Sequence, residues 1–120
     1  MNEVIVWVDG WQMQCCGTAF NIGSIIEWKV SQVSYDLSPI EDLGVIDYYY
    51  DDHAYNNTVS VLSGEVVEIC KVYHAYKLDE VNNVYRPVSG KLEKFNQEAD
   101  GWEVDYDSWK FVAYLVKVKK

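Results

Sequence analysis

Turn residues divide the chain into short runs of β-branched and aromatic residues, about ten residues apart. In one run, Ile26, Trp28 and Val30 alternate with polar residues, which is the period of a strand with one buried face. Residues 109–118 are almost continuously apolar, which indicates a central strand. Further strands are expected at 3–8, 45–50, 58–62, 64–78 and 84–89, and a short helix at 91–98. The pattern predicts a mainly β fold, a small barrel or sandwich of SH3 or OB size with at most one or two short helices.

The length of the chain sets its organisation. A chain of 120 residues is expected to form one domain over residues 1–120, and its hydrophobic share of 49% excludes disorder. The first residues lack the basic and long apolar regions of a signal peptide. No apolar run approaches the ~20 residues that cross a bilayer. The sequence therefore predicts a soluble, cytoplasmic protein.

Negative charge is concentrated in the first half of the chain. Residues 1–60 hold nine acidic residues and one basic residue, whereas residues 61–120 hold ten and nine, within a net charge of −9. Such a surface repels nucleic-acid phosphates and anionic lipids, and it attracts basic proteins. We therefore expect a protein partner with a basic surface, and neither direct nucleic-acid binding nor membrane binding. Solubility alone explains the charge equally well.

A cluster of tyrosines and carboxylates near the middle of the chain is the candidate binding surface. Tyrosine rings beside carboxylates suit an Arg- or Lys-rich partner, through cation–π contacts and charge-assisted hydrogen bonds. The expected binding residues are Tyr48, Tyr49, Tyr50, Asp51 and Asp52, with the preceding acids Glu41, Asp42 and Asp47. An ordinary aromatic strand would show the same pattern.

Two adjacent cysteines, Cys15 and Cys16, form the second candidate site. Neighbouring residues of a strand point to opposite faces, so both sulfurs can meet at one site only in a turn. A zinc site would then use Cys15, Cys16 and His53, with Asp51 or Asp52 as the fourth ligand, and a redox switch is the other chemical interpretation. No Cys-x-x-Cys spacing supports a metal, so no cofactor is favoured and zinc stays an alternative.

A structural interpretation of the same segment needs no chemistry. Trp11 and Phe20 would anchor the ends of a constrained turn in the core, while Gly17 and Gly23 would allow the chain to bend.

Other residues that could carry chemistry give weaker signals. Cys70 and His74 share a predicted strand, where four residues span ~13 Å, which is too far for two ligands of one zinc ion. His74 is instead expected to be a packed, hydrogen-bonded imidazole. A Cys/His nucleophilic pair is conceivable, but no local motif of a known enzyme class is present. We therefore expect a protein that is not an enzyme.

The motif Trp11-Gln12-x-x-Cys15-Cys16-Gly17-x-x-Phe20-x-x-Gly23, followed by Ile26-x-Trp28, resembles the N-terminal signature of a small uncharacterised bacterial domain family. The resemblance continues through Asp51-Asp52-His53, the segment from Gly64 to Ile69 and the closing strand from Phe111 to Val116. It covers most of the chain and implies a bacterial cytoplasmic protein, but no activity.

Three functions follow from these patterns. The leading hypothesis is a non-enzymatic acidic module that binds a basic protein surface, by analogy with immunity proteins and protein inhibitors. The second is a metal- or thiol-dependent site at the Cys-Cys motif. The third is a small-ligand site in the mouth of a β-barrel lined by Trp and Tyr.

Overall fold

The computed structural model describes residues 2–15, 17–31, 46–51 and 60–120. Within these residues the chain forms one short helix and six strands of one mixed sheet. In chain order the elements are β1 (Glu3–Asp9), α1 (Gly10–Cys15), β2 (Ile25–Ser31), β3 (Tyr48–Tyr50), β4 (Ser60–Asp79), β5 (Val84–Phe95) and β6 (Lys110–Lys119). The predicted mainly β fold is confirmed.

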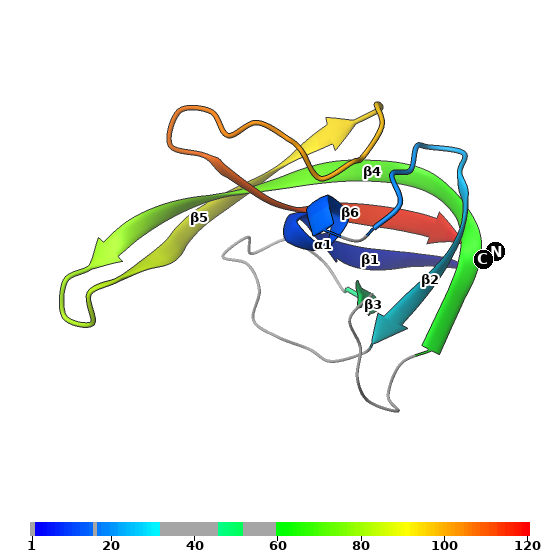
Figure 1. Ribbon diagram of the computed structural model, residues 1–120, viewed down its shortest axis with the longest axis horizontal. Helices are drawn as coiled ribbons and strands as arrows, with labels where there is room; N and C mark the ends of the chain where they lie inside the picture. The colour runs from blue at the N-terminus through cyan, green and yellow to red at the C-terminus, as the bar shows by residue number, and fades with distance from the viewer. Residues whose placement is uncertain (1, 16, 32–45, 52–59) are drawn as a thin grey trace.

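The strands form a small barrel. Hydrogen bonds run in a near-ring through β2, β3, β1, β6 and β4, because β4 pairs with β2 as well as with β6 (Figure 1). The pairing of β1 with β3 is parallel, and the other pairings of the ring are antiparallel. β6 lies between β1 and β4, which confirms the prediction of a central strand at 109–118. The two chain ends lie side by side, where the Lys120 amide donates to the Asn2 carbonyl at 2.9 Å.

One long strand, β4, closes the ring. Its residues 60–65 pair with β2, and its residues 65–74 pair with β6. Gly64 lies where the strand changes partners, opposite Ile26 of β2. Two separate strands were predicted at 58–62 and 64–78, and this is wrong: the chain continues through Gly64 as one bent strand because a glycine allows the close approach of the C-terminal strand.

The helix expected at 91–98 is absent from the described structure. Residues 91–95 instead continue β5, pairing with Ile69 through Tyr73 of β4. Their sequence, Lys-Leu-Glu-Lys-Phe, favours a helix locally, but pairing with a long neighbouring strand outweighs a propensity of a few tenths of a kcal/mol per residue. At the other end of the chain, β1 ends at Asp9 and α1 begins directly at Gly10.

Valine and aromatic side chains fill the barrel. Val6, Val30, Val66, Val116 and Val118 are each 0% exposed, and burial of each contributes about 1.5–3 kcal/mol. A smaller apolar cluster lies elsewhere on the sheet, around Trp7, Val72 and Ala113. The interior cluster extends to the rings of Phe20, Trp28 and Tyr50 at one end of the barrel, and these rings position the site described below.

Substituting Gly64 by alanine should destabilise the barrel. A Cβ atom there would lie 2.8 Å from Val118 Cγ1 and would also meet the backbone carbonyl of Lys119. We expect the free energy of unfolding to fall by about 1–3 kcal/mol, measured by urea denaturation. Ser63→Ala, at the exposed neighbouring position, should change it by less than about 0.5 kcal/mol. Equal stability of the two variants would contradict the proposed role of Gly64.

Candidate functional site

The three tyrosines of the predicted binding surface all lie on β3. Tyr50 is 6% exposed and points into the barrel, where its ring meets the Trp28 ring edge-on at 5.4 Å. Tyr48 is half-buried against the same interior cluster, and Tyr49 packs on the opposite face, against the cluster around Trp7. The sheet therefore divides the three rings between its two faces, and part of each ring contributes to packing.

Both described acidic residues of this surface make hydrogen bonds to the backbone, and Asp47 does so through its carboxylate. Asp47 links the start of β3 to β1, because its Oδ2 accepts from the Ile5 amide at 2.8 Å and its own amide donates to the Ile5 carbonyl at 2.9 Å. The amide of Asp51 donates to the Lys29 carbonyl at 2.9 Å, and Asp51 is half-buried. Glu41, Asp42 and Asp52 lie outside the described residues.

The Cys-Cys segment begins in α1. Cys15, the last residue of the helix, is disulfide-bonded, so its sulfur is not a free thiolate in this state. Cys16 and His53, the other two candidate zinc ligands, lie outside the described residues. Across the described ranges no group of three or more His, Cys, Asp and Glu side chains is close enough to hold a metal ion.

The structural interpretation of that segment is confirmed for Phe20 and Gly23 and is wrong for Trp11. Phe20 is 2% exposed, as expected for an anchor in the core, but Trp11 is 57% exposed and the prediction for it is wrong. Trp11 lies on the outer side of the short helix, whose buried residues are Gly10, Gln12 and Met13. Gly23 has a φ of 94°, a left-handed conformation that glycine adopts readily, so the predicted bend occurs there.

Cys70 and His74 both lie on β4, as the strand prediction required. Burial, and then the nearby carboxylate of Glu68, raise the pKa of the Cys70 thiol above its ordinary value. His74 is 3% exposed, with its ring centroid 6.5 Å from that of Trp7 and 6.1 Å from that of Tyr76. The prediction of a packed imidazole is confirmed, and the raised pKa makes Cys70 a poor nucleophile at neutral pH.

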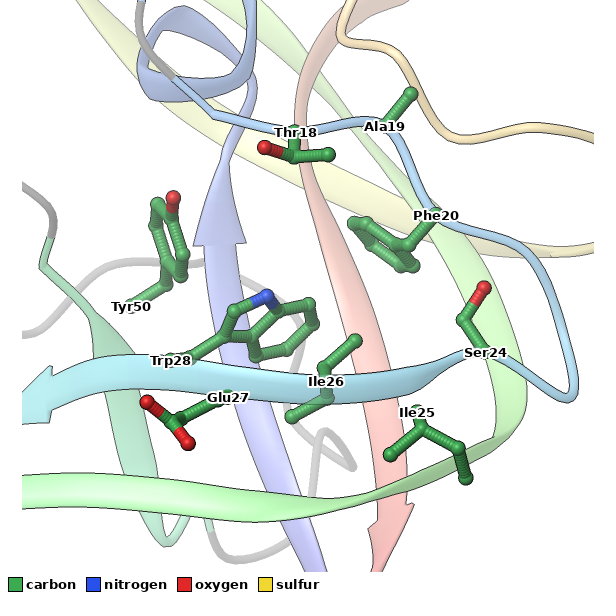
Figure 2. A pocket seen from close by; sticks show the side chains of 9 residues that line it. All are labelled: Thr18, Ala19, Phe20, Ser24, Ile25, Ile26, Glu27, Trp28 and Tyr50. Carbon is green, nitrogen blue, oxygen red and sulfur yellow. The ribbon is translucent and has the colours of Figure 1, made fainter.

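A pocket of about 330 Å³ opens at the mouth of the barrel, between β2 and the segment that follows α1 (Figure 2). We call it the barrel-mouth pocket. Its lining residues are Thr18, Ala19, Phe20, Ser24, Ile25, Ile26, Glu27, Trp28 and Tyr50. The segment from Thr18 to Phe20 is held in place by an isolated bridge between Phe20 and Ala99, with N···O distances of 3.2 and 2.8 Å.

Aromatic rings form the inner wall of this pocket. Phe20 and Tyr50 both meet the Trp28 ring edge-on, at centroid distances of 5.0 and 5.4 Å. Phe20 also meets Tyr114 edge-on at 5.9 Å. Edge-to-face contacts between buried rings fix their orientation. The wall is therefore already formed before any ligand arrives.

The indole N–H of Trp28 points into the pocket. Trp28 is 7% exposed, and its Nε1 has no hydrogen-bond partner among the described residues. Every fully buried nitrogen or oxygen of the described side chains has such a partner. The Nε1 atom must therefore border open space, and Figure 2 shows it on the side of the ring that faces Thr18 across the cavity.

Among the described lining residues, the charged side chain of Glu27 points away from the aromatic rings. Glu27 is a lining residue, but Figure 2 shows its carboxylate on the opposite side of β2 from the rings of Phe20 and Trp28. This follows from strand geometry, because Ile26, Trp28 and Val30 alternate inward while Glu27 and Lys29 alternate outward. The polar side chains among the described lining residues include Thr18, Ser24 and Trp28.

Sequence reasoning found part of this site. The alternation of β2 identified Trp28 as inward-facing, and Tyr50 was predicted as a binding residue, although for an exposed surface. Phe20 was expected only as an anchor. Thr18 and Ser24 gave no signal, because their positions depend on the bridge to Ala99 and on the turn where Ser24 Oγ accepts from the Asn21 amide at 2.9 Å.

These features define a class of protein: a small β-barrel with a preformed, aromatic-walled pocket at its mouth. Residues 2–120 match the model of a family of unknown function, DUF6578, and the chain belongs to this family. The match agrees with the extent of the resemblance noted above. No curated protein and no solved structure matches the chain. The helix in the described part of the chain is too short to cross a membrane.

Stability should depend on the protonation of His74. Burial lowers the pKa of His74 below its ordinary value of 6.5, so the folded protein takes up a proton less readily than the unfolded chain. We therefore expect the free energy of unfolding to decrease as the pH falls below 6.5. His74→Gln, which removes this titration, should flatten the dependence between about pH 7 and 5, measured by urea denaturation.

His53→Gln serves as the control, since it removes the other histidine of the chain. An unchanged slope in His74→Gln would show that the buried imidazole does not control this part of the pH profile.

Proposed function

We propose that this protein is a non-enzymatic binding protein that takes a small, uncharged polar molecule into the barrel-mouth pocket. The observation that carries the proposal is the indole N–H of Trp28, which belongs to a side chain that is 7% exposed, has no partner among the described residues and borders an open cavity. An unsatisfied buried donor is unfavourable by about 1–3 kcal/mol unless water or a ligand accepts its hydrogen bond. A ligand oxygen or ring nitrogen at this point would satisfy it.

The chemistry of the walls selects the charge of the ligand. Transfer of a charged group into a pocket without an opposite charge is strongly unfavourable. The described lining side chains include hydroxyls, an indole and aromatic rings, and the carboxylate of Glu27 lies on the other side of β2. An uncharged ligand rich in hydrogen-bonding groups matches these walls, because their exposed surface is more polar than apolar.

The size of the pocket limits the ligand further. A volume of about 330 Å³ is at the small end of the range for ligand sites in proteins. It fits a small molecule better than a folded partner. The same walls give a reason for the Trp11–Gly23 signature, since this segment supplies Thr18 and Phe20, and we expect other members of the family to carry it.

Replacing Trp28 by phenylalanine should weaken ligand binding. The Trp28→Phe variant would keep an aromatic wall but lose the N–H donor, and the loss of one such hydrogen bond corresponds to about a tenfold weaker affinity. Native mass spectrometry of protein purified from cell lysate would identify a retained molecule, and calorimetry would then compare Trp28→Phe with the wild type. Trp102→Phe is the matched control, because Trp102 is 68% exposed and does not line the pocket.

Two results would contradict the proposed ligand site. No retained molecule, together with no shift of the Trp28 indole signal when a library of uncharged fragments is added, would exclude the ligand site. Equal affinities of Trp28→Phe and Trp102→Phe would show that the indole donor has no part in binding.

A second candidate function, the acidic module that binds a basic protein surface, is favoured by the distribution of ion pairs. The ion pairs between described residues all lie in the second half of the chain: Lys71–Glu103, Arg86–Asp79, Lys91–Glu93, Lys110–Asp105 and Lys117–Glu68. The described acids of the first half form none with described residues. Asp9 and Asp47 accept internal hydrogen bonds. The charges of Glu3, Glu27 and Asp51 are available to an external partner, and Asp51 directly follows Tyr48 and Tyr49 of β3.

Charge reversal should test this second function. The double variant Asp51→Lys/Asp52→Lys is expected to weaken binding of a nona-arginine peptide several-fold more than Glu80→Lys/Glu98→Lys, which changes net charge equally. Fluorescence anisotropy would measure the binding of both variants. The affinity of the wild type should decrease as the salt concentration is raised from about 50 to 300 mM. Indifference to salt, or the same loss in both variants, would contradict an acidic site near β3.

A further inference from the structure

The β4–β5 hairpin extends beyond the barrel as a two-stranded arm (Figure 1). Pairing between β4 and β6 ends at His74 and Lys110, whereas β4 and β5 stay paired up to Asp79 and Val84. We call residues 75–88 the hairpin arm. In the described structure β5 is an edge strand, with β4 as its neighbour in the sheet.

One face of the hairpin arm is apolar and exposed. Leu78 lies directly opposite Tyr85, and Tyr76 lies opposite Pro87, so these four side chains share a face. Tyr85 is 71% exposed, Tyr76 40% and Leu78 39%. At the base of this face a hollow of about 500 Å³ is lined by Tyr76, Tyr85, Ser108 and Lys110.

The opposite face of the arm is more polar, and Val84, opposite Asp79, is an apolar residue on it. Lys77 lies directly opposite Arg86, and these two positions alternate with those of the apolar face. Arg86 pairs with Asp79 at 2.9 Å in an exposed ion pair. The arm is therefore amphipathic, as is expected for a ribbon that buries one face against another surface.

Asp79 holds the tip of the arm in a fixed shape. Its Oδ1 accepts from the amides of Val81 and Asn82, and its Oδ2 accepts from Asn82 Nδ2 and Arg86 Nε, both at 2.9 Å. These bonds keep the pKa of Asp79 below its ordinary value, with the Asn82 and Arg86 contacts as the main causes. A preformed arm can bury its apolar face with little loss of conformational freedom.

The charge of the arm indicates what covers it. The arm carries two basic residues, Lys77 and Arg86, and two acidic residues, Asp79 and Glu80, so it is neutral in a chain with a net charge of −9. A basic partner has acidic residues to bind elsewhere on the molecule and gains nothing from this face. Two copies of the chain, by contrast, can join through neutral arms while their acidic barrels stay apart.

We propose that the hairpin arm is a homodimer interface, in which Tyr76, Leu78 and Tyr85 of two copies pack face to face about a two-fold axis. A single self-complementary patch is what two-fold symmetry requires. Packing through the face is favoured over pairing through the β5 edge, because Pro87 removes one N–H donor from β5. The proposal does not depend on a ligand in the barrel-mouth pocket.

Sedimentation equilibrium of the full chain tests this proposal. The wild type is expected to dimerise reversibly, and Tyr85→Glu is expected to weaken the dimer by at least tenfold, because it places a charge in the centre of each apolar face. The matched control is Val104→Glu, which makes the same charge change at a side chain that is 78% exposed and lies outside the arm. Val104→Glu should dimerise like the wild type.

A wild-type protein that stays monomeric up to about 500 µM would overturn the proposal and leave the face to a different partner. Equal weakening by Tyr85→Glu and Val104→Glu would also overturn it, because net charge and not the arm would then control association. Tyr85→Ser, read by the same method and checked for folding by circular dichroism, removes the ring without adding charge and should weaken the dimer as well.

Discussion

The structure depends on the pairing of one strand with two partners. The first part of β4 hydrogen-bonds to β2 and the following part to β6, and this sharing turns a sheet with open edges into a near-ring. Ring closure creates an interior, which valine side chains fill, and a mouth, where the aromatic rings stop short of filling the space. Because β4 is 20 residues long and β6 only 10, the end of β4 runs past the ring and, with β5, becomes the hairpin arm.

Much of this fold could be predicted from the sequence, because period and composition are local signals. The alternation around Trp28 and the apolar run at 109–118 identified an inward face and a central strand correctly. The errors arose where distant contacts decide the outcome. Strands were expected to end at 62 and begin again at 64, yet Gly64 allows β4 to run on close to Lys119, and residues 91–95 have helical composition but complete the ladder with β4.

The candidate site depends even more on contacts between distant segments, which local sequence patterns do not show. Tyr50 was selected for its place among acidic residues, but its ring faces inward and builds a wall with Trp28. The partner of that wall, Phe20, comes from a segment whose position depends on a bridge to Ala99, almost eighty residues away in the chain. No pattern within the sequence indicates that contact. The surfaces that result differ in chemistry: a pocket at the barrel mouth with aromatic and hydroxyl side chains among its described lining residues, a neutral arm with an apolar face, and acidic residues in the first half that have no described ion pairs.

The central claim is that the Trp28 indole N–H is open to the barrel-mouth pocket while its ring is packed in the wall. Hydrogen exchange of the tryptophan indole protons, followed by NMR, tests this most directly. Trp7 provides the internal reference, because it is 2% exposed and its Nε1 donates to Asp9 Oδ1 at 2.9 Å. We predict that the Trp28 indole proton exchanges faster than that of Trp7 without ligand. Exchange as slow as that of Trp7 would contradict an open donor in the pocket.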